Sequence, residues 1–513
     1  MEASSKSIEV KQYTPEHLEE VVLSGPHAND AIIGRSLHLI YLKEYLKELG
    51  AQSMVIEHTY VDRDFLEDFA SYYVRCLKSY ERTCRRIHFF SQAFKQEDFE
   101  QLLAGETRSL TEQSLQASYL GFIVLKPLPE TVIGRTCLKP YEPEERRFYP
   151  VVRTYEVHLY GLKLEIKSIA FQEQDTVTSA CATSALWSVF QGTSKLYQHR
   201  VPSPVEITRL ATRLSPPVSR VLPNTEGLSE WQMAQAIRAV ALEPIAIGAA
   251  NPFVLKAYCY AYMKSHVPVL LTVVLNDWSS GKPELFGHHA VALTGFSLPA
   301  TTSPLPLRPY GMLLSATRMD KLYAHDDGIG PFARMEFEKS CLSTSWKGKD
   351  GKIGSVKAIP KGLLISVYHK IRISFLAIFN VVQDFDAFVQ VCRKDTGCLG
   401  GKARLEWDIY LTTVNEVKES IRNCPVLDPT YKLSILYEHM PRFIWRATAL
   451  LDGEPVIDLL FDATDIEQGD FFFRAIEYED DLAAGLRAFS PAADIEDWMS
   501  VRPIKFVFAW LQA

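Results

Sequence analysis

The sequence predicts an α+β protein built from three successive segments. Helical and strand patterns are mixed in the first and last thirds, and in the middle third a cluster of helices precedes a run of strands. The length of 513 residues indicates three domains, since a domain takes roughly 150 residues. We therefore expect an N-terminal α+β segment over 1–165, a central domain over 166–345 and a C-terminal α+β domain over 346–513.

The N-terminal segment contains one helical pattern and three strand patterns. Apolar and aromatic residues recur at three- and four-residue steps over 64–86, which predicts a buried helical face. SYLGFIVLKPLP (118–129) is typical of a strand ended by prolines. In TYEVHLYGLKLEI the apolar residues alternate on both sides of Tyr160-Gly161, which predicts a β-hairpin. The stretch 140–150 is rich in Glu, Arg and Pro, and we expect an exposed loop there.

The central domain is expected to begin with a helix that starts near Cys181. The apolar residues after Ser179 fall on one helical face, so Cys181 lies in the first turn. We expect Trp187 of this helix, and Trp231 of the next one, to be core residues. The patterns predict two further helices, over 229–242 and 252–265, and then strands over 267–275, 288–296, 311–317 and 320–326.

The C-terminal domain, from about Gly354 onward, is predicted to be a separate α+β unit. FIWRATALLDGEPVIDLLFDA (443–463) is typical of two strands joined at Asp452-Gly453, a dipeptide favoured in hairpin turns. A helix is expected over 407–422. No group of residues in this domain suggests chemistry.

Cys181 is the first candidate for chemistry. A cysteine nucleophile needs a stabilised thiolate, a neighbouring base and donors for an oxyanion, and the first turn of a helix favours the thiolate. Of the nine cysteines, Cys181 has the clearest placement of this kind, and the small residues of CATSA leave room for a substrate backbone. Taken alone, it could equally be a small residue of a buried core.

The partners of such a cysteine are sought in two downstream strands. In GHHAVALTGF the alternation places His288 and His289 on opposite faces, so at most one can meet the thiol, and His289 is the candidate general base. KLYAHDDGIGPF ends in a Gly-rich turn, where Asp326 or Asp327 could orient the imidazole. A core histidine and ordinary turn aspartates are the alternatives for these residues, but their combination with Cys181 predicts a catalytic triad.

This constellation resembles the papain-like cysteine peptidase superfamily. HAVALTGF is similar to the family's His-containing strand. IAFQEQD, CATSALW and LYAHDDGIGPF look closer to the bacterial branch that includes peptidases processing double-glycine leader peptides. The resemblance covers about 171–335. It implies a papain-like core, in which a helix bundle that opens with the Cys helix packs against an antiparallel sheet.

The resemblance also implies a role for each site residue. Cys181 would be the nucleophile, His289 the general base and Asp326 the residue that orients it. Gln174 would donate to the oxyanion together with the backbone N–H of Cys181.

Two of these assignments have alternatives. Gln174 lies one residue farther from Cys181 than is usual in the family, so Gln172 is the other candidate oxyanion donor. The family's Pro is missing after His325-Asp326, which leaves Asp327 open as the orienting carboxylate. The family's usual Gly after the cysteine is replaced by Ala182, another small residue.

The function expected from these residues is that of a thiol protease. It would hydrolyse a peptide or isopeptide bond in a protein substrate through a thioester intermediate. The alternatives are a papain-like acyltransferase or amidase, similar to a transglutaminase, and a non-catalytic papain-like module that binds peptides. No cofactor or metal is expected, since no cysteine and histidine cluster has the spacing of a zinc site.

Composition limits the kinds of partner and the cellular compartment that we expect for the protein. A net charge of −7 gives no overall basic field for nucleic acid or anionic membranes. The first twenty residues show no signal-peptide pattern, and apolar runs such as PVLLTVVL are shorter than the roughly 18 residues that span a bilayer. The odd number of scattered cysteines is typical of reduced thiols in the cytoplasm. We expect a protein or peptide substrate and a regulatory protein partner, with the flanking segments selecting the substrate or controlling access.

Overall fold

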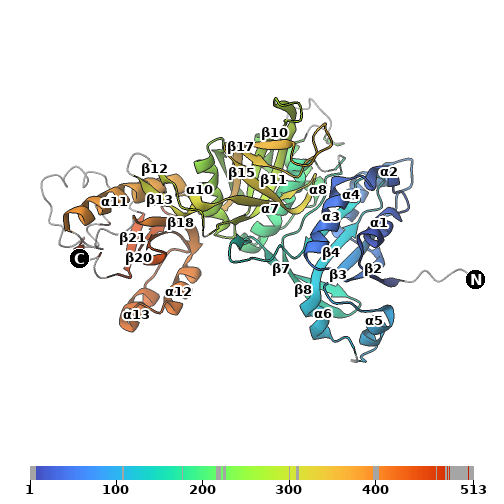
Figure 1. Cartoon of the computed structure of the whole chain (residues 1–513), viewed down its shortest axis with the longest axis horizontal. Helices are drawn as coiled ribbons and strands as arrows, with labels where there is room; N and C mark the ends of the chain where they lie inside the picture. Colours follow the sequence, from blue (N-terminus) through green and yellow to red (C-terminus); the bar gives the residue numbers. More distant parts are fainter. Residues whose placement is uncertain are drawn as a thin grey trace, which may run out of the picture. The chain divides into compact units, whose positions relative to one another are not determined.

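The computed structural model shows a mixed α+β protein, as predicted (Figure 1). The chain divides into two compact units. Unit 1 comprises Met1–Asn251, His266–Ser297 and Lys321–Ser366, and unit 2 comprises Pro252–Ser265, Leu298–Asp320 and Val367–Ala513. The expected division at 165 and 345 stays a prediction, and the units interleave along the chain. The structure describes residues 7–106, 109–175, 177–178, 180–214, 221–222, 227–299, 301–307, 311–396, 404–468, 471–479, 482, 484–485 and 507.

Unit 1 begins with a five-stranded antiparallel sheet in the order β1-β2-β3-β4-β5. Its strands are β1 (Ile8–Gln12), β2 (Ser53–Tyr60), β3 (Cys84–Phe90), β4 (Tyr119–Leu125) and β5 (Ile133–Leu138). The helices of this region are α1 (Pro15–Leu23), α2 (Asp30–Ile33), α3 (Leu37–Glu48), α4 (Arg63–Ser71), α5 (Gln96–Leu103) and α6 (Glu112–Ser118). A separate hairpin follows, formed by β7 (Arg153–Leu159) and β8 (Leu162–Ser168), as the alternation predicted.

The helix predicted over 64–86 is wrong in its second half. Helix α4 ends at Ser71, and β3 begins at Cys84. The arginine at position 86 is buried in this strand, where its guanidinium pairs with Glu57 and lies over the ring of Tyr60. Sheet pairing with β2 and β4 therefore outweighs the three- and four-residue spacing in this stretch.

A closed six-stranded barrel forms the centre of unit 1, because β17 pairs with β10 and completes the ring. Its strands in order are β10 (Val269–Asp277), β11 (Glu284–Ser297), β14 (Lys321–Asp326), β15 (Gly330–Glu338), β16 (Cys341–Ser343) and β17 (Val356–Tyr368). Two short extensions pair outside the ring, β6 (Arg147–Phe148) with β11 and β9 (Leu242–Gly248) with β17. Strand β17 starts beyond 345, the expected end of the central domain.

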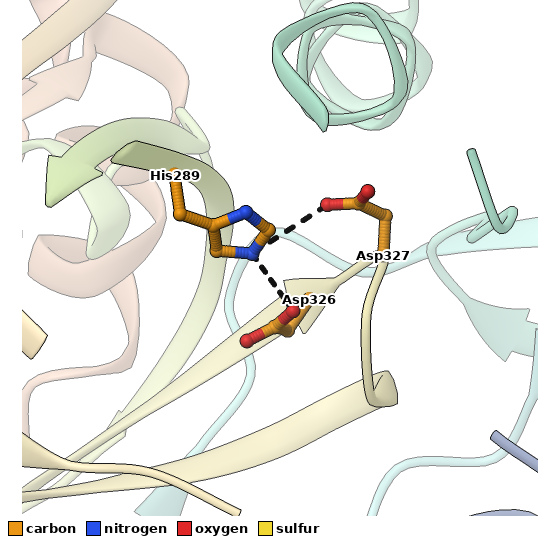
Figure 2. Close-up of side chains that lie close together, drawn as sticks. All are labelled: His289, Asp326 and Asp327. Carbon is orange, nitrogen blue, oxygen red and sulfur yellow. Dashed lines mark hydrogen bonds and ion pairs between the residues drawn. The ribbon is translucent and has the colours of Figure 1, made fainter. Parts of the chain in front are cut away.

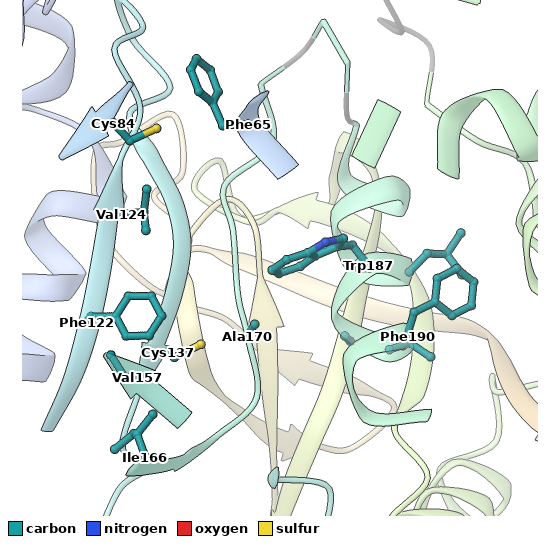
Figure 3. Close-up of a cluster of buried hydrophobic side chains, with 14 of the residues drawn as sticks. Phe65, Cys84, Phe122, Val124, Cys137, Val157, Ile166, Ala170, Trp187 and Phe190 are labelled. Atoms are coloured by element: carbon teal, nitrogen blue, oxygen red, sulfur yellow. The ribbon is translucent and has the colours of Figure 1, made fainter. Parts of the chain in front are cut away.

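Helix α7 (Cys181–Tyr197) packs across β10, β11 and β14 of the barrel. The helix is buried on all sides from Ala182 to Thr193. Trp187 and Phe190 are buried completely, in a cluster that also contains Phe122 of β4 and Ile166 of β8 (Figure 3). The N-terminal sheet, the hairpin and the Cys181 helix thus share one hydrophobic core. Helices α8 (Pro204–Thr212) and α9 (Glu230–Ala239) pack against each other beside α7.

Unit 2 is built on a six-stranded sheet with helices. Its strands in order are β12 (Pro306–Leu307), β13 (Met312–Leu314), β18 (Glu406–Thr413), β19 (Phe443–Leu451), β20 (Glu454–Asp462) and β21 (Phe472–Glu477). Its helices are α10 (Pro252–Met263), α11 (Phe375–Thr396), α12 (Val414–Asn423) and α13 (Pro429–Tyr437). The hairpin at Asp452-Gly453 is confirmed. The helix predicted over 407–422 is wrong in its first half, where buried Trp407, Ile409 and Leu411 alternate along β18.

One stretch of α11 meets the criteria for a membrane span. Among the described helices, only Phe375–Arg393 is long and apolar enough to cross a bilayer, and 61% of this window is buried inside the protein. A core helix passes the same test, so the finding is weak evidence for a membrane segment.

Candidate active site

Cys181 is the first residue of α7, and it is partly buried. The residue before it, Ala180, is extended, and no described side chain caps the helix. The first N–H groups of the helix are therefore not occupied by a capping side chain, and they point out of the same end that presents the thiol. This is the placement that the apolar periodicity predicted.

His289 reaches the site from β11. It is 8% exposed, whereas the neighbouring His288 is exposed on the opposite face, as the alternation predicted. Strand β11 pairs with β14 so that Ala292 lies opposite His325, and this register brings His289 beside the turn that follows β14. Cys181 and His289 line the same pocket, and the thiol adds the smallest of the contributions that raise the pKa of His289, after those of Asp326 and Asp327.

Asp326, at the end of β14, is the carboxylate that hydrogen-bonds His289. The ring Nε2 donates to its Oδ1 at 2.9 Å (Figure 2), and the backbone N–H of Gly328 donates to the same oxygen at 3.0 Å. The other oxygen, Oδ2, accepts a bond of 3.0 Å from the indole Nε1 of Trp346. Since Nε2 faces the carboxylate, Nδ1 is the ring nitrogen left for the thiol of Cys181.

The ion pair shifts both members away from their ordinary titration ranges. Burial by itself would lower the pKa of His289, but the nearby carboxylates of Asp326 and Asp327 outweigh it and hold the pKa well above 6.5. Burial would likewise raise the pKa of Asp326, but His289 and the hydrogen bonds from Trp346 and Gly328 hold it below 3.8. The charged pair, imidazolium with carboxylate, is therefore the favoured state of this site.

Asp327 differs from its neighbour. Its Oδ1 lies 3.6 Å from the same Nε2 of His289, and neither carboxylate oxygen has a hydrogen-bond partner within the described part of the chain. Burial is the main reason that the pKa of Asp327 rises to about 6. The candidate ligand atoms of His289, Asp326 and Asp327 all lie within 4.8 Å of one another, so a divalent cation is a chemical alternative to the ion pair.

Trp346 belongs to the site, although the sequence patterns did not point to it. It lies in the loop between β16 and β17, and its ring meets that of His289 edge to face, with centroids 5.3 Å apart. The indole thus contacts the ring of His289 and donates a hydrogen bond to Asp326. Its signal in the sequence was a lone aromatic residue in the polar stretch STSWKGKDGK.

The two candidate oxyanion donors lie in the segment that leads into α7. This segment starts along the edge of the N-terminal sheet, where Phe171 bridges Thr136 of β5. Gln172 is 7% exposed, and its amide Nε2 has no hydrogen-bond partner among the residues that the structure describes. Gln174 is partly exposed. A buried donor without a partner costs free energy, and a bound group that accepts its hydrogen bond would remove that cost. Of the two glutamines, Gln172 is therefore the better candidate donor.

A pocket of about 300 Å³ opens beside Cys181 and His289. Its wall combines apolar groups with the charged side chains of Glu230 and Lys361. The lining residues are Cys181, Ala182, Gly227, Leu228, Ser229, Glu230, Met233, Thr272, Val273, His288, His289, Ala290 and Lys361. Trp187 is buried as expected, but the prediction that Trp231 is a core residue is wrong, because it is 49% exposed, next to Glu230 at the start of α9.

No sequence model of a known family matches the chain, and no curated protein matches it either.

Proposed function

We propose that unit 1 contains a papain-like peptidase core and that the protein is a cysteine peptidase of the thiol hydrolase class. The observation that supports this most is that Cys181, at the N-terminus of α7, and His289, hydrogen-bonded to Asp326, line one pocket. A helix packed across an antiparallel barrel also supports the papain-like assignment, and so does the order of the three residues along the sequence. The pocket fits one side chain of a peptide substrate.

In the proposed reaction the thiolate of Cys181 attacks the carbonyl carbon of the scissile bond. The oxyanion of the tetrahedral intermediate accepts hydrogen bonds from the backbone N–H of Cys181 and from a glutamine side chain. His289 then protonates the leaving amine through Nδ1, which leaves a thioester. A water molecule, deprotonated by His289, attacks the thioester and releases the carboxylic acid and the free thiol. Asp326 fixes the ring orientation by accepting from Nε2.

Gln172 is the oxyanion donor that we favour over Gln174. The reason is its buried amide, whose N–H groups lack a partner among the described residues. Loss of such a donor costs about 3 kcal/mol of transition-state stabilisation. We expect Gln172→Ala to slow turnover on the order of a hundredfold and Gln174→Ala to slow it much less. The reverse ranking, measured as kcat/KM for the two variants, assigns the role to Gln174.

The substrate and compartment belong to the same proposal. A protein or peptide substrate fits a pocket with both apolar and charged walls, and the bond cleaved is a peptide or isopeptide bond. We place the activity in the cytoplasm with reduced thiols, since the eight cysteines that the structure describes are all free. We also propose a regulatory protein partner, because a large part of the chain lies outside the site and is available to control access to it.

The test uses a peptide library prepared from a cell lysate, incubated with the full-length protein and read by mass spectrometry. We expect new carboxyl termini with the wild type and with His158→Ala, a control at an exposed histidine outside the pocket, and none with Cys181→Ala or His289→Ala. Glycine amide is added as an acceptor amine. Products that carry this amine at their new carboxyl termini would show that the reaction is acyl transfer and not hydrolysis.

Two further outcomes separate the remaining alternatives. Peptides that bind wild type and Cys181→Ala equally, with no product from either, would contradict an enzyme and favour a binding module. A metal-dependent activity would appear as turnover that a chelator abolishes and a divalent cation restores. We expect turnover to be unaffected by the chelator.

A further inference from the structure

His38, in the first turn of α3, is a buried histidine of the N-terminal segment. Its Nε2 donates to the backbone carbonyl of Asp327 at 2.6 Å. Its Nδ1 lies 3.2 Å from Oε1 of Glu173. One imidazole thus contacts both the turn that holds the candidate triad carboxylates and the segment that holds the candidate oxyanion donors.

Glu173 is itself fixed to the N-terminal sheet. Its Oε2 accepts from the backbone N–H of Ile133 at 3.0 Å, and its own N–H donates to the carbonyl of Ile133 at 3.1 Å. The side chain is buried, and it stands between Gln172 and Gln174 in the sequence. A shift of Glu173 would therefore displace both candidate oxyanion donors.

A second residue of α3 holds the other end of the aspartate turn. The Tyr41 hydroxyl donates to the carbonyl of Pro331 at 2.7 Å. Its ring packs so closely on Gly330 that a Cβ there would lie 2.4 Å from a ring carbon. His38 and Tyr41 are three residues apart, so they lie on one face of the helix. Helix α3 contacts the turn on both sides of its tip.

We infer that His38 is a positioning residue of the active site, which sets the separation between the aspartate turn and the oxyanion segment. The inference rests on the proposed function, since only an acyl-transfer site needs these two segments in register. Both act in one transition state: the turn holds His289 through Asp326, and the segment supplies the oxyanion donor. The role of the N-terminal segment is then to complete the site, in addition to any selection of substrate.

His38→Ala removes both contacts, and we expect it to lower kcat on the order of a hundredfold while KM stays unchanged. Glu173→Gln is the conservative variant. A neutral His38 can still donate from Nε2 to Asp327 and accept at Nδ1 from the new amide, so we expect activity close to that of the wild type. Glu173→Ala offers no such partner and should resemble His38→Ala.

The control for a merely structural effect is Leu42→Ala, which removes another buried side chain of α3 and leaves His38 in place. All variants are assayed as full-length protein at a temperature where each is folded. Hydrogen exchange is followed in parallel over 171–175 and 326–332. We expect faster exchange in both segments for His38→Ala and Glu173→Ala, and in neither for Glu173→Gln or Leu42→Ala.

Exchange that rises in only one segment for His38→Ala would overturn the inference, and so would an equal loss of kcat in Leu42→Ala. The same variants distinguish failure of this inference from failure of the proposed function. If the wild type and all variants lack turnover, the proposed function fails and the positioning role fails with it, even where exchange shows that His38 ties the two segments together. If the wild type turns over and His38→Ala does so equally well, the inference alone fails.

Discussion

At the scale of single residues, adjacent aspartates of one turn have opposite electrostatic roles. Asp326 is paired with His289 and hydrogen-bonded on both oxygens, and its pKa lies below 3.8. Asp327 is as deeply buried but has no hydrogen bond from any described residue, and its pKa rises to about 6. Sequence alone left the two equivalent, because a choice between them depends on where a tryptophan from a distant loop donates its N–H.

Replacement of Asp327 by Asn should stabilise the protein above pH 6. With a folded-state pKa of about 6 against an ordinary value of 3.8, the wild type loses stability as the pH rises between these values. The loss is at most about 3 kcal/mol, and the variant does not suffer it. Urea unfolding at pH 7.5 should therefore give a higher free energy of unfolding for Asp327→Asn, with no gain at pH 4. A gain of equal size at both values would contradict the assignment.

Asp326→Asn should have the opposite effect. The raised pKa of His289 contributes stability that is complete below 6.5 and is lost as the pH rises through the folded-state value. The lowered pKa of Asp326 contributes stability that is complete above 3.8 and is lost toward lower pH. Between these limits, loss of a buried pair costs about 3–5 kcal/mol. Urea unfolding at pH 5.5 should show this deficit, and a variant as stable as the wild type there would exclude the pair.

The elements that carry Cys181, His289 and the aspartate pair of the candidate site could be predicted from sequence, and the residues that position them could not. Cys181 follows from a helix start, His289 from strand alternation and the aspartate pair from a strand that ends in a turn, which are all local patterns. Trp346 and His38 act through contacts made across the fold. Nothing near them in the sequence marks those contacts, so the tertiary structure was needed to find them.

At the scale of elements, the turn between β14 and β15 needs a glycine at position 328. A Cβ on Gly328 would lie 2.1 Å from ring carbons of Trp346, the indole that donates to Asp326. The glycine therefore permits the close approach of the β16–β17 loop to the turn. The sequence indicated a Gly-rich turn here, but not what packs against it.

Gly328→Ala should displace Trp346 and weaken the site. The expected loss is that of one hydrogen bond to a charged group, about 1.5–3 kcal/mol, or roughly one to two orders of magnitude in kcat/KM if it is felt fully in the transition state. Gly248→Ala is the matched control, because a Cβ there meets nothing within 4 Å. Indole fluorescence and peptide turnover measure the two effects. Equal behaviour of the two variants would contradict the role given to Trp346.

Element prediction succeeded where one pattern dominated and failed where helix and strand signals overlapped. The hairpin at Asp452-Gly453 and the helix from Cys181 follow from turn chemistry and apolar periodicity. The stretches 64–86 and 407–422 each contain a helix and a strand. The apolar residues of both stretches have helical spacing locally. One half of each stretch is nevertheless a strand, because it pairs with strands from other parts of the sequence.

At the scale of the whole molecule, the predicted central domain cannot be separated cleanly from its neighbours. Strand β17 closes the barrel although it starts at Val356, and α7 shares its core with the N-terminal sheet. Residues 166–345 alone would leave β10 without one partner and expose the apolar face of α7.

A polypeptide of 166–345 should therefore lack a cooperative fold. We expect broad thermal unfolding by circular dichroism, where the full chain shows a sharp transition, and no peptide turnover. A truncated chain that unfolds cooperatively and cleaves the library as the full chain does would show that closure of the barrel by β17 and the N-terminal sheet are dispensable.

The central claim is that Cys181 is a nucleophile activated by His289. Its most direct test is the rate of alkylation by iodoacetamide at neutral pH, read by peptide mass spectrometry, with the partly buried Cys424 as an internal comparison. We predict that Cys181 reacts much faster than Cys424, that His289→Ala removes the difference, and that His158→Ala, at an exposed histidine outside the pocket, preserves it. Equal rates for the two cysteines in the wild type, or a Cys181 rate unchanged by His289→Ala, would contradict the claim.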